Sequence, residues 1–259
     1  MSNTLAARTI KVLIPLPSRD FDPTEVAVSW KNLRDLDVTF ATPDGEVAAE
    51  DPRMMSGEGL GAFKFMLRAD RAARLAMEEL KKTREFNHPI TYKDIRVEDF
   101  DGILLPGGHA PAMRAYMEST LLQMKVAQFF DSNKPMAAIC HGVVLAARSI
   151  SQKTGKSILY QKNVTALVKT SELLAWNLTK KRLGNYYRTY PDTTVEDEVV
   201  STLIDKKNFH HGPPTLLKDT PTSTWKGFAV VDGNLVTARW PGDVNKFSLS
   251  FRELLERNR

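Results

Sequence analysis

The stretch Pro135-Met136-Ala137-Ala138-Ile139-Cys140-His141-Gly142-Val143-Val144-Leu145 decides the fold, because in it a short apolar strand leads directly into a helix. The turn between them carries Cys140, the only cysteine of the chain, flanked by the small residues Ala138 and Gly142. A side chain at such a turn projects from a sheet edge, where N–H groups of the helix start bind anions. The stretch predicts a cysteine nucleophile whose thiol pKa lies below the reference value of about 8.5. The alternative is a small buried hydrophobic residue.

Other apolar segments of strand length recur along the chain, namely 10–16, 38–41, 102–105 and 164–168. Segments that are apolar throughout are typical of parallel strands covered by helices on both faces. The first helix begins at Asp22-Pro23-Thr24-Glu25, which offers an N-cap, a proline and a capping-box acid, and extends to about Leu36. The pattern predicts an α/β protein with a mainly parallel sheet.

The length of 259 residues fits a single domain, 1–259, of this class. Two segments are longer than a crossover needs and are predicted to be helical insertions, at about 46–99 and 169–227. Amphipathic spacing indicates a helix over 69–82, and a second helix over 171–184 ends at a glycine. Both helices are expected to cover the cysteine. A hairpin over 228–238 and a last helix over 244–256 follow.

Composition excludes several classes of protein. With 42% hydrophobic and 26% charged residues, no segment approaches the length of a membrane span, and no secretory signal is seen, so we expect a cytoplasmic protein without a membrane partner. One cysteine allows neither an internal disulfide nor a thiolate metal cluster, and we expect no metal and no cofactor. The 36 basic and 31 acidic side chains are dispersed, which argues against a nucleic-acid partner.

Candidate site residues follow two strands and begin one helix. Gly107, Gly108 and His109 come after the strand at 102–105, at the same sheet edge as Cys140. The amides of Gly108 and His141 can form an oxyanion hole, although a plain glycine turn into a helix is the alternative. Glu25 is either the capping-box residue only or also an acid that shares a proton with the thiolate.

Three aromatic residues of the second insertion, Trp176, Tyr186 and Tyr187, are candidates for lining the site. Ordinary packing is the alternative interpretation for each of them.

Four motifs together resemble the ThiJ/PfpI family, within the class I glutamine amidotransferase-like superfamily. They are Leu104-Leu105-Pro106-Gly107-Gly108-His109, Ala138-Ile139-Cys140-His141-Gly142, Phe40-Ala41-Thr42-Pro43-Asp44-Gly45, and Asp232-Gly233-Asn234-Leu235-Val236-Thr237-Ala238-Arg239 with Pro241-Gly242-Asp243. The resemblance implies a flavodoxin-like three-layer sandwich, a reactive Cys140, an acidic partner at Glu25 and a homodimer. The large insertions look most like the branch with heat-shock chaperones and glutathione-independent glyoxalases.

The chain departs from the family pattern in two places. No histidine after Cys140 stands in the His-x-Glu setting of true amidotransferases, so ammonia transfer from glutamine is not expected. In the chaperone and glyoxalase branch an acid on the following strand pairs with the histidine that corresponds to His141. Residues 165–170 contain no acid, and Glu172 is the nearest substitute.

The leading hypothesis is a cysteine-dependent hydrolase or lyase that acts on small reactive carbonyl compounds such as methylglyoxal. Cys140 would form a thiohemiacetal or a thioester, and His141 would move protons. One alternative is a non-enzymatic stress protein, either a redox sensor at Cys140 or a holdase chaperone. A further alternative is a peptidase or amidase.

Overall fold

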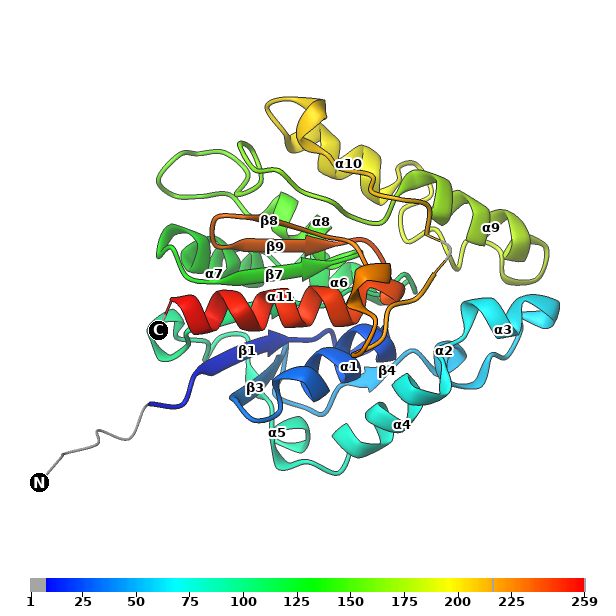
Figure 1. Ribbon diagram of the computed structural model, residues 1–259, viewed down its shortest axis with the longest axis horizontal. Helices are drawn as coiled ribbons and strands as arrows, with labels where there is room; N and C mark the ends of the chain where they lie inside the picture. The colour runs from blue at the N-terminus through cyan, green and yellow to red at the C-terminus, as the bar shows by residue number, and fades with distance from the viewer. Residues whose placement is uncertain (1–7, 216, 259) are drawn as a thin grey trace, which may run out of the picture.

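The computed structural model describes residues 8–215 and 217–258, and a seven-stranded sheet forms its centre (Figure 1). All neighbouring strands in this sheet are parallel except the last pair, which forms an antiparallel hairpin. The predicted mainly parallel sheet is therefore confirmed. In sheet order the strands are β5 (Ile90–Thr91), β3 (Asp37–Thr42), β1 (Lys11–Pro15), β6 (Gly102–Leu105), β7 (Met136–Ile139), β9 (Leu235–Ala238) and β8 (Ala229–Asp232).

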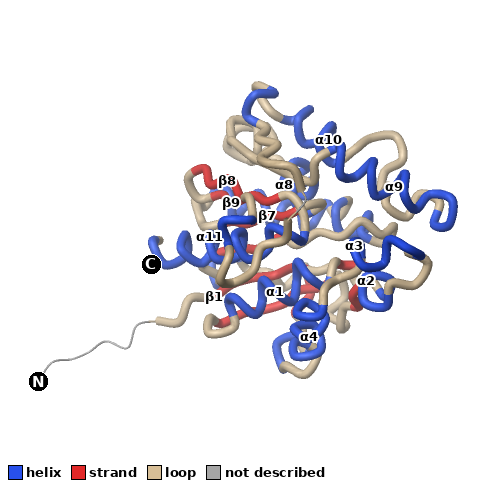
Figure 2. Tube along the Cα trace, turned by 45° about the vertical axis from the view of Figure 1, so that its right-hand side comes forward, coloured by secondary structure: helices blue, strands red, loops and turns tan. Residues whose placement is uncertain are grey.

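Helices cover both faces of this sheet (Figures 1 and 2). Helices α1 (Pro23–Leu33) and α11 (Val244–Arg257) pack together on one face, whereas α6 (Met113–Met117), α7 (Thr120–Asp131) and α8 (Gly142–Arg148) pack on the opposite face. The three-layer sandwich is confirmed. Among the described residues, no helix combines the length and the apolar character that a bilayer crossing requires.

The remaining elements belong mostly to the two insertions. They are β2 (Arg19–Phe21) and β4 (Ala49–Glu50), which pair in a small second sheet, and α2 (Pro52–Ser56), α3 (Lys64–Leu67), α4 (Arg71–Leu80), α5 (Arg84–Asn87), α9 (Lys169–Leu183) and α10 (Val195–Thr202). Short 3-10 turns occur at Gly61–Phe63, Val97–Asp99, Lys206–Asn208, Thr224–Lys226 and Pro241–Asp243.

The central strands are apolar because they are enclosed on both faces. All residues of β6, β7 and β9 are buried, and they join one hydrophobic cluster with the inner sides of the flanking helices. Strand β9 pairs with β7 on one side, from Met136 opposite Leu235 to Ile139 opposite Ala238, and with β8 on the other. The C-terminal part of the chain thus completes the sheet beside the cysteine strand.

The prediction of a strand at 164–168 is wrong, because the structure has no strand there. Within it, Val164 makes only an isolated bridge to Phe209, and the Thr165 N–H donates to the Thr237 hydroxyl at 2.9 Å instead of to a strand. The reason is topological, because β9, which carries Thr237, already has β7 and β8 as its two neighbours. The apolar side chains Val164 and Ala166 are buried, which explains the misleading pattern.

The predicted helix over 69–82 forms as α4, but it does not cover the cysteine. Helix α4 packs against α1 at the outside of the sandwich, and its buried side chains Ala73, Ala76, Met77 and Leu80 face the protein core. In Figures 1 and 2 it lies at the far side of α1 from the sheet. Helix α9, from the second insertion, is the one that lies over the carboxyl ends of the strands.

Candidate active site

Cys140 lies in the turn between β7 and α8, with a backbone φ of 55°. This left-handed conformation costs a residue other than glycine about 1–2 kcal/mol, and such strain is typical of functional sites. The Cys140 N–H donates to the Ala238 carbonyl at 3.1 Å, which continues the pairing of β7 with β9 into the turn. At Gly142 only glycine fits, because a Cβ there would lie 2.2 Å from the Leu105 carbonyl oxygen.

The Cys140 sulfur faces the imidazole of the next residue, at 3.4 Å from Nδ1 of His141. On the other side of the ring, Nε2 lies 3.0 Å from the Thr189 hydroxyl oxygen. That hydroxyl donates its single hydrogen to the His109 carbonyl oxygen at 2.6 Å, so it can only accept a hydrogen bond from Nε2. The ring hydrogen of neutral His141 is therefore on Nε2, and Nδ1 is free to accept the thiol proton.

His141 is neutral because it is almost completely buried. Burial, followed by the nearby His109, lowers the pKa of His141 to about 3. A neutral imidazole with an unprotonated Nδ1 beside a thiol is the arrangement of a general base.

Glu25 reaches the same place from the first turn of α1 and is completely buried. Its Oε2 accepts the Gly107 N–H at 2.7 Å, and no partner for Oε1 is found in the described part of the chain. Burial, and then repulsion from Asp22, raises the pKa of Glu25 well above its ordinary value. The buried carboxyl therefore holds its proton more tightly than an exposed glutamate does. A hydrogen bond between the Glu25 carboxyl and the Cys140 side chain acts in the opposite direction and lowers the pKa of Glu25.

The expectation of a lowered thiol pKa is wrong. Burial raises the pKa of Cys140 well above its ordinary value, and repulsion from Glu25 and Asp22 adds to the shift. The His141 N–H acts in the opposite direction but is outweighed. The sequence indicated the helix start correctly but could not show that the thiol is shielded from water and faces carboxyl groups.

The glycine pair after β6 has two different roles. The Gly107 N–H binds Glu25, and a Cβ at this position would lie 2.7 Å from the His141 nitrogen, so the close approach requires glycine. Gly108 lines the cavity that contains Cys140. The oxyanion hole predicted at the amides of Gly108 and His141 remains a prediction, to which Gly107 does not contribute.

A cavity of about 420 Å³ opens beside Cys140. Buried polar groups such as Glu25 line it together with apolar side chains from α2, α3, α9 and the chain that follows β9, and the lining residues of α3 and α9 include exposed ones. The residues that line this cavity include Asp22, Glu25, Phe65, Met66, Arg68, Gly108, His109, Cys140, Leu167, Glu172, Leu174, Tyr187, Lys218 and Trp240. This volume is within the range of small-molecule sites.

Of the three aromatic candidates, the structure places one in the cavity wall. Tyr187 lines the cavity and stacks on His109, with ring centroids 4.2 Å apart. Tyr186 packs edge-on against both rings and donates its hydroxyl hydrogen to Asp51, the N-cap of α2. Trp176 packs against the cluster that contains Tyr187, and its ring N–H donates to the Asn185 side chain at 3.2 Å. Tyr186 and Trp176 thus pack the two insertions against each other.

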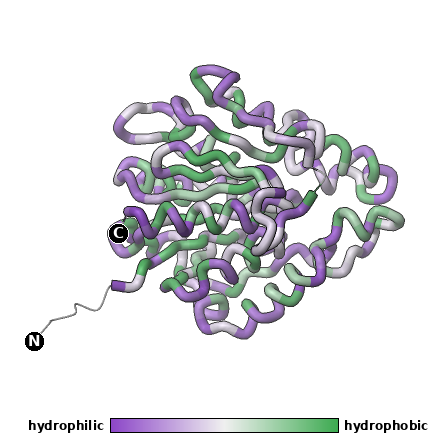
Figure 3. Tube along the Cα trace, viewed as in Figure 1, coloured by the Kyte–Doolittle hydropathy of each residue, from purple (hydrophilic) through white to green (hydrophobic). Residues whose placement is uncertain are grey.

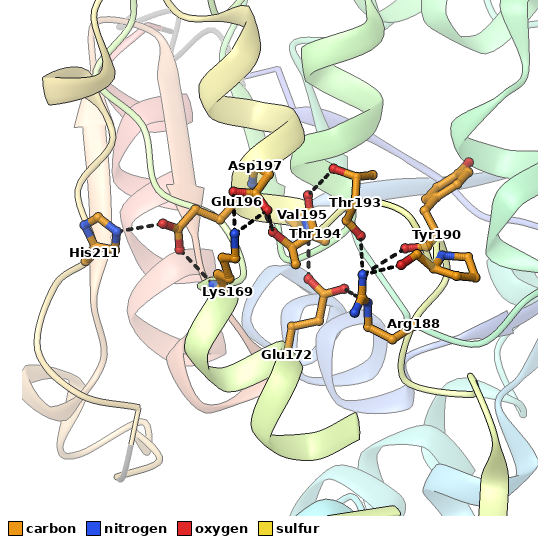
Figure 4. Close-up of polar contacts among 11 residues, drawn as sticks. Lys169, Glu172, Arg188, Tyr190, Thr193, Thr194, Val195, Glu196, Asp197 and His211 are labelled. Atoms are coloured by element: carbon orange, nitrogen blue, oxygen red, sulfur yellow. Dashed lines mark hydrogen bonds and ion pairs between the residues drawn. The ribbon is translucent and has the colours of Figure 1, made fainter. Parts of the chain in front are cut away.

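Glu172 lines the cavity, and its carboxyl group contacts Val195 and Arg188 (Figure 4). Its Oε2 accepts the Val195 N–H at 2.9 Å, and its Oε1 lies 3.4 Å from Nε of Arg188. Burial raises the pKa of Glu172 to about 7 despite these contacts. Glu172 was a possible third acid for His141. The partner of His141 Nε2 is instead the Thr189 hydroxyl.

Sequence reasoning missed Thr189, Asp22 and the α3 residues Phe65 and Met66. Thr189 lies in the turn-rich segment after α9, and nothing in a lone threonine marks it as a histidine partner. Asp22 was identified only as the N-cap of α1, yet it lines the cavity, and burial raises its pKa to about 6. Within residues 8–215 and 217–258, no group of three or more His, Cys, Asp and Glu side chains could hold a metal ion.

A family model described as ThiJ/PfpI family-like matches residues 16–213. Among proteins of similar sequence, the glutathione-independent glyoxalase hsp3101 of Schizosaccharomyces pombe is 31% identical over 145 residues, which cover 55% of this chain and 52% of that protein. A deglycase of Pyrococcus abyssi is 23% identical over 170 residues, covering 66% of this chain and 71% of the relative.

Solved structures show the same fold. That of glyoxalase III from Candida albicans superposes with a TM-score of 0.61 at 18% identity, covering 95% of this chain and 97% of the other. The flavodoxin-like sandwich expected from the motifs is confirmed by this likeness.

Proposed function

We propose, from the premise that the chain belongs to the ThiJ/PfpI-like family, that it is a cysteine-dependent hydro-lyase converting 2-oxoaldehydes and water to 2-hydroxy acids without glutathione. The observation that carries the proposal is the Cys140 sulfur 3.4 Å from an unprotonated His141 Nδ1, beside a cavity that is also lined by Glu25, a buried carboxyl with a raised pKa. Relatives named glyoxalase and deglycase support the same class of reaction.

The reaction begins when the thiol adds to the aldehyde carbon of methylglyoxal. The sulfur–carbon bond forms while His141 Nδ1 takes the thiol proton and returns it to the aldehyde oxygen, which gives a hemithioacetal. His141 then removes the hydrogen from the former aldehyde carbon and delivers it to the neighbouring ketone carbon through an enediol. The former aldehyde carbon is oxidised to a thioester while the ketone carbon is reduced to an alcohol. Water cleaves the thioester and releases lactate, so no external oxidant or reductant is needed.

Glu25 serves this reaction best as a neutral acid. Oε1, for which the described residues offer no hydrogen-bond partner, carries the proton and donates a hydrogen bond to the substrate oxygen that becomes negative in the enediolate. A carboxylate at this position would repel that charge. The amides of Gly108 and His141 are the proposed donors to the oxygen on the carbon attacked by sulfur.

The protonated thiol favours this proposal over a redox sensor. Peroxide oxidises thiolates, and the raised pKa of Cys140 keeps the sulfur protonated in the resting protein. An aldehyde, in contrast, can be attacked as the proton moves to His141, so a pre-ionised thiol is not required.

The test is lactate formation from methylglyoxal by the purified protein in the absence of glutathione. Cys140→Ser should reduce the rate to background, and Cys140→Ala should do the same while its circular dichroism spectrum stays that of wild type. Lactate formation by Cys140→Ala at the wild-type rate would refute the nucleophilic mechanism. Absence of lactate with the wild-type protein would refute the function.

A further inference from the structure

The outer part of the cavity exposes large apolar side chains to solvent. Phe65 and Met66 on α3 are 84% and 40% exposed, and Leu174 on α9 is 56% exposed. All three line the same cavity as Cys140. We call these three residues the apolar rim. Helices α3 and α9 lie next to each other in both ribbon and tube views, and both carry apolar residues (Figures 1, 2 and 3).

The apolar rim is connected to the catalytic end by more apolar surface. Met54, Leu167 and Tyr187, which are less exposed than the rim, also line the cavity. Methylglyoxal offers only one methyl group to such a surface. A cavity of about 420 Å³ with this lining fits a ligand with a reactive polar end and a bulky apolar end.

The charged side chains of the lining are of both signs, with Asp22, Glu25 and Glu172 on one side of the balance and Arg68 and Lys218 on the other. Lys218 lies close enough to Asp22 to lower the pKa of that carboxyl, so it balances an acid of the site itself. Glu172, which lines the cavity from α9, already has Arg188 as its cationic neighbour. Because these charges are of both signs, we assign substrate selection to the apolar surface, which forms a larger part of the lining than the charged groups do.

We infer that the substrates are 2-oxoaldehydes with a bulky apolar substituent, an aryl or branched alkyl group, which the apolar rim holds while Cys140 attacks the aldehyde. This inference rests on the proposed function and names the substrate class for it. Each added apolar group that becomes buried improves kcat/KM by about tenfold or more, so an aryl substrate should be clearly preferred over methylglyoxal.

The experiment compares phenylglyoxal with methylglyoxal, measured as formation of mandelate and lactate rather than as loss of aldehyde. We expect wild-type kcat/KM to be at least tenfold higher for phenylglyoxal. Leu174→Gln should lower the ratio of the two kcat/KM values at least fivefold. Leu75→Gln is the matched control, because Leu75 is also a helical leucine, is 53% exposed and lies on α4, away from the cavity. It should leave the ratio unchanged.

The outcomes separate the two proposals. If lactate forms but the wild-type ratio is one or less, the substrate inference is overturned and the glyoxalase function stands. If neither product forms, the function fails, and the inference fails with it. Light scattering gives a further check: if Leu174→Gln converts a dimer to a monomer, a second copy of the chain covers the rim, and the inference is overturned.

Discussion

At the scale of single residues, the orientation of His141 depends on Thr189. The hydroxyl accepts from His141 Nε2 and donates to the His109 carbonyl, which fixes the tautomer that leaves Nδ1 free for the thiol. Thr189→Val removes both bonds with little change in shape. We predict a fall in kcat of roughly tenfold to a hundredfold, because part of the imidazole population then carries its hydrogen on Nδ1.

The controls for this substitution are present in the chain. Thr189→Ser keeps the hydroxyl and should recover most of the activity. Thr165 is equally buried, but its hydroxyl has no partner among the described residues, so Thr165→Val should leave kcat unchanged. Equal losses in Thr189→Val and Thr165→Val would show that the effect comes from packing and not from the histidine.

A second prediction concerns Glu25 and the thiol. Glu25→Gln keeps a hydrogen-bond donor and an acceptor but cannot ionise, so a thiolate that forms at Cys140 as the pH rises no longer meets a second negative charge at this position. The rate of iodoacetamide alkylation, followed against pH by mass spectrometry, should show a lower thiol pKa in the variant than in wild type. An unchanged or higher thiol pKa would contradict the proposed contact.

At the scale of elements, α10 holds α9 in place over the site (Figure 4). Helix α9 begins at Lys169 without a side-chain cap from Val168, and Glu196 supplies one from outside, accepting the Lys169 N–H at 2.7 Å. The other Glu196 oxygen lies 2.9 Å from His211. One carboxylate thus connects the start of the covering helix with the chain that leads to Lys218.

We therefore predict that Glu196→Ala lowers the free energy of unfolding by about 1 kcal/mol, the usual effect of losing a helix N-cap. Because α9 lines the cavity without contacting the reacting atoms, KM should rise more than kcat falls. Urea unfolding and steady-state kinetics measure the two effects. Glu253→Ala, at an exposed site of α11, is the control and should change neither quantity.

The sequence predicted the elements in which the spacing of apolar residues clearly matches a helix or a buried strand. Strands β6 and β7 were placed at their observed bounds, and α1, α4 and α9 within a few residues, because burial on one or both faces dictates their patterns. The prediction of a strand at 164–168 was wrong, because an apolar segment indicates burial but not whether a sheet edge is free to pair with it. Likewise, Cys140 and Glu25 could be found from their positions after β7 and at the start of α1. Thr189 could not, because its partner lies 48 residues away and only tertiary structure unites them.

At the scale of the whole molecule, burial of carboxyl groups makes stability depend on pH. The folded state raises the pKa of Asp22 to about 6 and that of Glu172 to about 7, above the ordinary values of 3.8 and 4.5. The folded state therefore binds these protons more tightly than the unfolded chain does. The stabilisation from both groups is complete below the ordinary values and is lost as the pH rises through 6 and 7.

The prediction is that the free energy of unfolding falls between pH 5 and pH 8, as measured in urea. Glu172→Gln removes one of the two groups and should reduce this difference by up to ~3 kcal/mol. Glu253→Gln, on the exposed side of α11, should reproduce the wild-type difference. A wild-type stability that rises over this interval would show that Asp22 and Glu172 are charged in the folded protein.

The pairing of β7 with β9 has a consequence for how the protein is made. Strand β9 follows β7 by roughly 100 residues, and at the usual synthesis rate of about 5–20 residues per second the nascent chain carries an unpaired β7 edge for some 5–20 seconds. Such an edge is a template for pairing with other chains, and all four residues of β7 are apolar. Until Leu235 to Ala238 have left the ribosome, the cysteine strand offers an unpaired apolar edge to other chains, so slow translation of the segment between β7 and β9 would lower the yield of soluble protein without altering a single residue.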